Sequence, residues 1–449
     1  MKFDVVVVGS GFNGCFASWY ASRKGLKTAL IDKSDLLGGV ICNHIPWKDY
    51  SIDLGAHNLD LRNSCLRDYF IELLQGQISY LDNGQWGSMV NSNIKMGYEC
   101  PVLSDLECIN PFPIIDERLT KISTSQSCQV DHISSLEDYY HNRFGKTYGQ
   151  FMAQISRKLT GFYSQDISPI FSRSLKGLDR ISPLPDPITK ILKQHSHVLD
   201  DVLAISETTL AQLDPVRRQK NIIGYPLLGG MGALGMQLPK LMNKININMF
   251  LGKSIVSLQQ NKAWHIVLDD DTRLDADVLI WSIDPFLFIK LIDKHAQRHQ
   301  CKSASLELTA LEVDSSSLIG PDYVYDYNLN FNEYRYSSQG RYSRQETDDK
   351  KSFVISEAIV SDNDNVHDSS QGRRIFNRLV GCGFLSVNAQ LFDSKKWLFK
   401  SVINVPLKGA DKCVTSQELF MSSIPNLICG RYNQTQRHAW VELIEKQLA

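Results

Sequence analysis

The sequence has little of what marks several common classes of protein. No block of like charges stands out, and 48 basic side chains against 49 acidic ones leave a net charge of −1. This balance gives no reason to expect nucleic acid or an anionic membrane surface as a partner. Ten cysteines are spread from Cys15 to Cys429 without a CxxC pair or metal-ligand spacing. We therefore expect no metal site, and most cysteines to be small buried side chains in a reducing compartment.

Long apolar runs are missing as well. The most apolar later stretch, residues 278–292, is interrupted by Asp284, Pro285 and Lys290, which makes it too short and too polar to span a bilayer. The first expected strand begins at Phe3 and leaves no room for a signal peptide before it. These observations predict a cytoplasmic protein without a membrane span. A chain of 449 residues is also too long for one simple core, so we expect two domains.

Several common catalytic, metal-binding and nucleotide-binding motifs are absent too. The sequence contains no Ser/His/Asp arrangement, zinc motif or P-loop. His195 and His197 are two residues apart and lie on different faces of a helix, so they are not expected to share a metal ion. A bound cofactor is therefore expected to carry the difficult chemical step.

The strongest motif lies in the first forty residues. Residues 5–8 are four consecutive valines, which are typical of a strand buried on both faces of a parallel sheet. They are followed by the sequence GSGFNG at residues 9–14, and residues 15–23 can continue as a helix. This order of strand, glycines and helix predicts a dinucleotide-binding site.

Each glycine of this motif has a physical reason. Gly9 permits the tight turn, Gly11 lets the backbone approach a pyrophosphate, and Gly14 lets the helix pack against the strand. The free amides at the start of the helix then receive the anion.

The residues that follow favour FAD over NAD. A second strand over residues 27–31 leads to Asp32, placed to accept hydrogen bonds from an adenosine ribose, and a terminal Asp on its own leans towards NAD. Gly38-Gly39 follows after five residues, and residues 53–57 read DLGAH. In this combination the chain resembles the FAD-binding N-terminus of the amine oxidase and protoporphyrinogen oxidase superfamily, which also includes UDP-galactopyranose mutase. Asp32 stands where that family usually has Glu.

The resemblance implies an α/β fold. It predicts a Rossmann-type FAD-binding domain, with a parallel sheet that is discontinuous in sequence, interleaved with an α+β substrate domain. The FAD-binding domain is expected at residues 1–60, 220–300 and 415–449, and the substrate domain at residues 61–219 and 301–414. FAD is expected to be non-covalent, because no cysteine stands in the Ser-Gly-Gly-Cys context that anchors it in some amine oxidases. The implied cofactor-binding residues are Gly9, Gly11, Phe12, Asn13, Gly14, Asp32, Lys33, Gly38, Gly39, Val40, Gly55, Ala56, His57, Ile255, Gly430, Arg431, His438, Ala439 and Trp440.

Several later segments resemble the same family. Residues 58–130 are expected to mix short strands and loops. Ser134 and Glu137 have the spacing of a capping box for a helix that ends at Gly145, and a second helix is expected over residues 147–159. The glycine-rich residues 224–232 are expected to return the chain to the FAD-binding domain, as in the family. Pro239 interrupts the helix that follows.

The tyrosines near residue 325 leave two interpretations open. Tyr323, Tyr325 and Tyr327 alternate and so lie on one face of a strand, near Arg335 and Arg341 in sequence. Such a face could stack on a ring substrate while the arginines hold a phosphate or carboxylate. It could equally be a sheet packed on helices.

The end of the chain also matches the family pattern. A short strand over residues 424–429 leads to Gly430-Arg431, and a terminal helix is expected from Arg437. In the family the N-terminus of this helix faces the pyrimidine edge of the flavin and stabilises negative charge there. Typical amine oxidases carry Gly-Asp here, and Gly-Arg is closer to the mutase and to sugar-pathway relatives, which favours a role in carbohydrate biosynthesis.

Three functional hypotheses follow. The first is an FAD-dependent oxidoreductase that transfers a hydride from a small cyclic substrate, such as a sugar, nucleotide sugar or amine, to flavin N5. The second is a redox-neutral sugar mutase resembling UDP-galactopyranose mutase, in which reduced flavin attacks the anomeric carbon; it is less favoured because its nucleotide-binding segment is not matched here. The third is a non-catalytic flavin-binding protein. The candidate catalytic residues are His57, Arg335 and Tyr327, and His57 could instead satisfy a backbone group.

Overall fold

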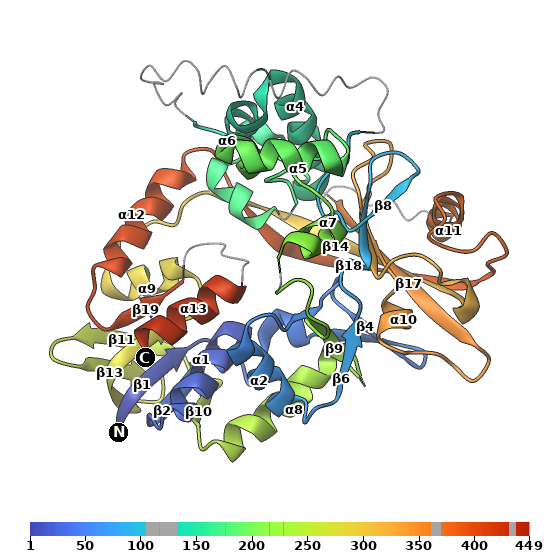
Figure 1. Cartoon of the computed structure of the whole chain (residues 1–449). Coiled ribbons are helices and arrows are strands. Elements are labelled where there is room, and N and C mark those ends of the chain that lie inside the picture. Colours follow the sequence, from blue (N-terminus) through green and yellow to red (C-terminus); the bar gives the residue numbers. More distant parts are fainter. Residues whose placement is uncertain are drawn as a thin grey trace. The chain divides into compact units, whose positions relative to one another are not determined.

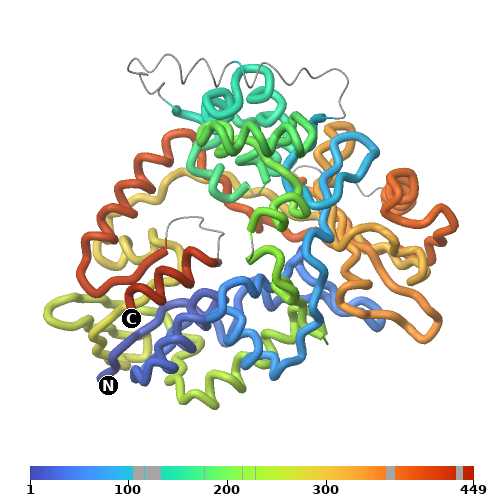
Figure 2. Tube along the Cα trace, viewed as in Figure 1, coloured from blue at the N-terminus to red at the C-terminus, as the bar shows by residue number. Residues whose placement is uncertain are grey.

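The computed structural model describes residues 1–104, 116, 133–175, 177–214, 216–227, 229–360, 370–430 and 437–448. The chain divides into two compact units. Unit 1 comprises Met1–Tyr80, Ile223–His299 and Lys412–Ala449, and unit 2 comprises Leu81–Ile222 and Gln300–Asp411. Blue, yellow-green and red parts of the trace in Figure 2 all belong to unit 1, so this unit is discontinuous in sequence. The first boundary follows Tyr80, whereas the sequence predicts it after residue 60. The assignment of the units to cofactor and substrate stays a prediction.

Unit 1 is built on a seven-stranded sheet (Figure 1). The strand order is β10-β2-β1-β13-β12-β11, and β19 also pairs with β13. Strands β10, β2, β1, β13 and β19 are parallel, and β12 and β11 continue the sheet antiparallel. The predicted Rossmann-like parallel sheet is thus confirmed. Its strands are β1 (Lys2–Val8), β2 (Thr28–Asp32), β10 (Asn248–Leu251), β11 (Ile255–Gln260), β12 (Trp264–Leu268), β13 (Arg273–Trp281) and β19 (Leu427–Cys429).

Smaller sheets and helices complete unit 1. The short strands are β3 (His44–Trp47), β4 (Tyr50–Asp53), β5 (Leu59–Asp60), β6 (Ile78–Leu81) and β9 (Ile223–Pro226). The helices are α1 (Phe12–Arg23), α2 (Ser64–Leu73), α8 (Gly232–Lys244), α9 (Pro285–Ile292), α12 (Ala410–Ser422) and α13 (Arg437–Gln447), with a 3-10 turn η1 (Gly39–Cys42). Helix α8 continues through Pro239, so the predicted interruption does not end the helix.

The valine run behaves as predicted. Val5 to Val8 are each at most 4% exposed, because β1 lies between β2 and β13 at the centre of the sheet. Helix α2, in contrast, lies in a segment where the sequence predicted only strands and loops. Its buried side chains Leu66, Tyr69, Phe70 and Leu73 have helical spacing, and Asn63 caps it by accepting the amide of Leu66 at 2.9 Å.

Unit 2 contains a second seven-stranded sheet and a group of helices. The strand order is β18-β14-β17-β16-β15-β7-β8. The strands are β7 (Trp86–Met89), β8 (Ile94–Met96), β14 (Cys301–Asp314), β15 (Tyr323–Asp326), β16 (Glu333–Ser337), β17 (Lys351–Val360) and β18 (Leu391–Pro406). The helices are α4 (Leu136–Thr160), α5 (Asp186–His195), α6 (His197–Val202), α7 (Glu207–Leu213), α10 (Gln339–Tyr342) and α11 (Gln371–Gly381), with 3-10 turns η2 (Ser164–Asp166), η3 (Pro169–Ser174) and η4 (Ser315–Ser317).

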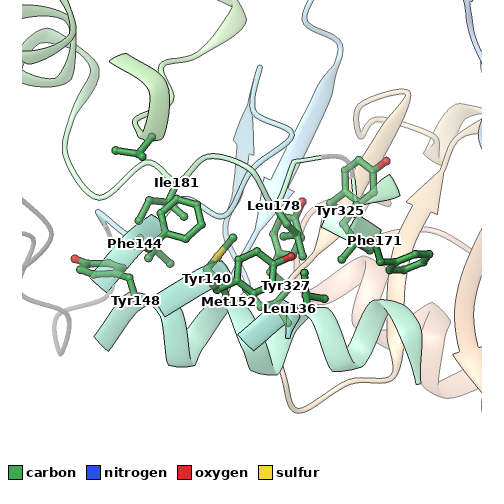
Figure 3. Close-up of a cluster of buried hydrophobic side chains, with 14 of the residues drawn as sticks. Leu136, Tyr140, Phe144, Tyr148, Met152, Phe171, Leu178, Ile181, Tyr325 and Tyr327 are labelled. Carbon is green, nitrogen blue, oxygen red and sulfur yellow. The ribbon is translucent and has the colours of Figure 1, made fainter. Parts of the chain in front are cut away.

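The tyrosine row of β15 packs against α4. Tyr325 and Tyr327 belong to one buried cluster with Tyr140 and Met152 of α4, as Figure 3 shows. The rings of Tyr325 and Tyr327 are stacked, with centroids 6.0 Å apart. Of the two interpretations left open by the sequence, the structure therefore shows a sheet face packed on a helix.

Helix α4 tests two local predictions. The predicted break at Gly145 is confirmed, since this residue has φ 80° and ψ 175° inside the helix. The predicted capping box was one residue too early, because Ser135 and Asp138 form it. The Ser135 hydroxyl accepts the Asp138 amide at 3.1 Å, and the Asp138 carboxylate accepts the Ser135 amide at 3.0 Å.

No helix in the described part of the chain is long and apolar enough to cross a membrane. Within the same described ranges, no group of three or more His, Cys, Asp or Glu side chains is arranged to hold a metal ion.

Candidate functional site

Five glycines from two segments meet at the carboxyl end of β1 and form what we call the glycine cradle: Gly9, Gly11, Gly14, Gly38 and Gly39. Gly9 has φ +100°, which only glycine adopts easily, and its amide donates to Ile31 O at 2.8 Å. A Cβ on Gly14 would overlap the carbonyl oxygen of Gly9, so the absence of a side chain lets α1 pack directly on the end of β1. Gly38 forms a parallel bridge with Gly11.

Gly11 differs from the other glycines of the cradle. A Cβ placed on it would meet no atom within 4 Å among the described residues. Its own backbone is extended, with φ −64° and ψ 179°, so neither strain nor crowding inside the protein requires glycine here. Open space in front of a bare backbone at the start of α1 fits a pyrophosphate that approaches the helix N-terminus.

Asp32 ends β2 beside this cradle. Its carboxylate accepts the amide of Ser10 at 2.5 Å and that of Ser34 at 2.8 Å. The segment that follows the neighbouring strand β10 reaches the same edge. There the amide of Lys253 donates to Asp32 O at 3.0 Å, and Ile255 lies two residues further along the chain. The carboxyl ends of parallel strands meet at one edge of the sheet, so the segment that leads to Ile255 passes the end of β2 that carries Asp32.

Asp53 anchors the segment that includes Gly55, Ala56 and His57. This carboxylate is fully buried and accepts the Met231 amide at 3.0 Å and the hydroxyl of Tyr225. Asp53 thereby fixes the loop before α8 to the end of β4. His57 is half-buried, and its Nε2 lies 3.1 Å from Leu54 O.

Helix α13 is attached to the same end of unit 1. The indole N–H of Trp440 donates to Asn13 O in the first turn of α1 at 3.0 Å, and Trp440 is 3% exposed. His438 Nε2 lies 2.6 Å from Asp60 Oδ2. Gly430 directly follows β19, whose carboxyl end lies at the same edge of the sheet as that of β13. Arg431 lies outside the described residues.

Comparison with known proteins agrees with the Rossmann-like fold of unit 1. A scan against protein families matches residues 7–73 to the NAD(P)-binding Rossmann-like domain. Among solved structures, reduced UDP-galactopyranose mutase is 14% identical, with 99% of this chain and 94% of that chain covered and a TM-score of 0.62. A protein from Exiguobacterium sp. 255-15 assigned as a protoporphyrinogen oxidase is 14% identical, with 99% and 98% covered and a TM-score of 0.57. Putrescine oxidase is 12% identical, with 100% and 98% covered and a TM-score of 0.58.

The chain has the fold of these proteins. The resemblance seen in the sequence is thus confirmed at the level of the fold. A search of curated protein sequences found no match.

Four further predicted cofactor residues differ in how exposed their side chains are. The ring of Phe12, which is half-buried, stacks on Phe70 with centroids 5.6 Å apart and so contributes to the contact between α1 and α2. Lys33 and Val40 are exposed next to the cradle, Val40 to 71%. Ala439 is half-buried in the first turn of α13.

Arg335 lies in unit 2 and forms an ion pair inside the protein. Its Nε and one terminal nitrogen each lie 2.6 Å from an oxygen of Glu357, which is 1% exposed. The Glu357 carboxylate draws the pKa of Arg335 further above its usual value, against the opposing effect of burial. The fork that was expected to hold a substrate phosphate is therefore used by Glu357, and Arg341 is likewise bound to Asp322 at 2.9 Å.

Tyr327 also has a structural position. It is 1% exposed, its hydroxyl donates to Glu99 O, and burial raises its pKa well above the usual value. A buried phenol with these contacts is poorly suited to proton transfer with a substrate. Neither Tyr327 nor Arg335 therefore enters the chemistry proposed below.

Asp60 and Arg62 were not among the site residues predicted from the sequence. Arg62 donates to both oxygens of Asp60, from Nε at 2.9 Å and from a terminal nitrogen at 2.5 Å. The sequence shows an acid and an arginine at i, i+2 spacing. The partner of Asp60, His438, is 378 residues away, and no local pattern indicates that the two side chains meet.

Proposed function

We propose that the chain is an FAD-dependent oxidoreductase that takes a hydride from a small cyclic substrate and holds its FAD without a covalent bond. The observation that carries the proposal is the open space over Gly11 at the N-terminus of α1, next to the Asp32 carboxylate. When bound, the flavin would supply a two-electron acceptor at N5.

The residues of unit 1 have separate roles in this proposal. The backbone amides at the start of α1 bind the pyrophosphate, and Asp32 accepts hydrogen bonds from the adenosine ribose. Asp53 holds the segment with Gly55, Ala56 and His57 against the loop before α8. Trp440 holds the start of α13 beside α1, where the positive end of the helix dipole stabilises negative charge on a reduced cofactor.

The similarity to reduced UDP-galactopyranose mutase supports a second candidate function. A redox-neutral sugar mutase would use the same cradle. It would need a reductant only to begin turnover, whereas an oxidoreductase consumes an electron acceptor at each turnover. Counting acceptor molecules consumed per product separates the two.

The first test is the visible spectrum of the purified protein before and after anaerobic dithionite, with the released cofactor identified by chromatography. Flavin bands that bleach on reduction, and FAD released on denaturation without protease treatment, are the expected result. A colourless protein that FAD cannot reconstitute would refute the proposal.

A further inference from the structure

A carboxylate and a histidine from opposite ends of the chain meet beside the glycine cradle. Asp60 ends β5, and His438 lies in the first turn of α13, with Nε2 2.6 Å from Asp60 Oδ2. Trp440, two residues after His438, is bonded to Asn13 O in the first turn of α1. The pair therefore lies close to the turn of α1 that lines the cradle.

The surroundings of Asp60 fix its charge. Burial alone would raise the pKa of this carboxyl, but hydrogen bonds from His438 and Arg62 outweigh burial and hold the pKa well below its usual value. Asp60 is therefore an anion at neutral pH and can only accept hydrogen bonds.

The charge of Asp60 in turn selects the tautomer of His438. Because Asp60 accepts, Nε2 must carry the proton that is shared between them, and the neutral ring has its lone pair on Nδ1. Among the described residues, Nδ1 has no hydrogen-bonding partner. The side chain is 31% exposed, so a small molecule can reach it.

We propose that His438 is the catalytic base of the flavin reaction, that Asp60 is its positioning residue, and that the substrate carries a hydroxyl group on the carbon that is oxidised. This inference rests on the proposed function. The alcohol loses a hydride with its electron pair from carbon to the flavin and its hydroxyl proton to Nδ1, and a carbonyl forms. The alcohol is oxidised by two electrons, the flavin is reduced by two, and the proton leaves the imidazolium for solvent.

The chemistry of hydride loss is the reason that we propose an alcohol, and not an amine, as the substrate. A neutral amine stabilises the developing positive charge with its nitrogen lone pair and does not need to lose a proton in the same step. An alcohol that loses hydride becomes a protonated carbonyl, which is strongly acidic, so a base next to the hydroxyl lowers the barrier. A histidine held by a carboxylate is suited to this task.

The first experiment needs neither substrate nor flavin. Nitrogen-15 NMR of the histidine rings, with the His438 signal assigned by its loss in His438→Gln, should show a protonated Nε2 and an unprotonated Nδ1. Asp60→Asn should shift the ring towards a mixture of tautomers, and Asp60→Glu should restore the original signal in part. A proton on Nδ1 in the wild-type protein would overturn the proposal.

The second experiment uses the flavin-loaded protein under anaerobic conditions. Hydroxyl-bearing probes (UDP-glucose, glucose and benzyl alcohol) and an amine probe (benzylamine) are mixed with it, and bleaching of the flavin is followed. Reduction by a hydroxyl probe should slow on the order of 100-fold or more in His438→Gln, and less in Asp60→Asn. Reduction by benzylamine alone, by no hydroxyl probe, or at an unchanged rate in His438→Gln would contradict the proposal.

A second histidine–carboxylate pair in unit 1 serves as the control. His265 Nδ1 lies 2.6 Å from Asp275 Oδ1, and both side chains are about half exposed, at 48% and 47%. Asp275 pairs with Lys2 near the start of β1, at the opposite end of the sheet from the cradle. His265→Gln should leave flavin reduction unchanged. A protein with the expected His438 tautomer but no flavin would refute the proposed function, whereas a flavoprotein with the other tautomer would refute only the role of His438.

Discussion

Trp440 and Asn13 are 427 residues apart in sequence and are joined by a hydrogen bond from the indole Nε1 to the Asn13 carbonyl oxygen at 3.0 Å. The bond ties the last helix of the chain to the first turn of the first helix. Because that first turn faces the open space at Gly11, the docking of α13 and the shape of the proposed cofactor site depend on the same contact.

Replacing this indole tests that dependence. Trp440→Phe keeps most of the apolar area and removes the hydrogen bond, which should lower the free energy of unfolding by about 1 kcal/mol and weaken FAD affinity. Trp264→Phe is the matched control, since Trp264 Nε1 donates to Asn426 O at the same 3.0 Å, away from the cradle. Denaturant unfolding and FAD titration would measure both effects. Equal FAD affinity in the two variants would contradict the role of Trp440 at the site.

Two glycines of the cradle should fail in different ways. Gly11→Val places its side chain in open space, so the variant should keep its melting temperature and lose flavin. Gly14→Ala forces a Cβ against the Gly9 carbonyl, so it should lose about 1–3 kcal/mol of stability before any effect on flavin is considered. Thermal unfolding of the flavin-free proteins and flavin content after purification would separate these outcomes. Full FAD occupancy in Gly11→Val would refute the cradle.

Arg335 should behave as a structural residue. Arg335→Met leaves the Glu357 carboxylate buried without its cation, at an expected cost of about 3–5 kcal/mol. Adding Glu357→Gln should recover part of that loss, because the uncompensated charge is removed. Denaturant unfolding of the two single variants and the double variant gives the interaction energy. An Arg335→Met protein as stable as wild type but inactive would instead return Arg335 to the catalytic candidates.

Lys158 should make stability depend on pH. Burial lowers its pKa to about 8 from the usual 10.5, against the opposing effect of Asp326 and Glu333. Between pH 8 and 10.5 the folded protein releases this proton before the unfolded chain does, so the unfolded state binds more protons and the free energy of unfolding rises with pH. The rise should be on the order of 3 kcal/mol.

Lys158→Met should abolish that rise, while Asp326 keeps its contact with Arg378 at 3.1 Å. The difference in unfolding free energy between wild type and variant, measured in steps across this window, isolates Lys158 from other titrating groups. A difference that does not change with pH would show that Lys158 keeps its usual pKa in the folded protein.

Local patterns were enough to predict the first strand, the glycines of the cradle and one helix break. The valines of β1, the glycines after them and the break at Gly145 all follow from preferences of single residues and their neighbours, and the structure bears them out. Helix α2 was not predicted, although its buried side chains Leu66, Tyr69, Phe70 and Leu73 have helical spacing.

Partners distant in sequence could not be predicted. Arg335 looked available for a substrate because nothing near it in sequence indicates Glu357, which pairs with it across two antiparallel strands. For the same reason Asp60 was overlooked, since its partner His438 comes from the other end of the chain. Side-chain pairing of this kind is set by tertiary structure, and a motif only shows which groups are present.

The most direct test of the central claim is titration of the flavin-free protein with FAD and, separately, with NAD, in wild type and in Gly11→Val. We expect wild type to bind FAD and not NAD, and Gly11→Val to bind neither while remaining folded. Binding of NAD in place of FAD, or FAD affinity that is the same in both proteins, would contradict the assignment of the glycine cradle as an FAD site.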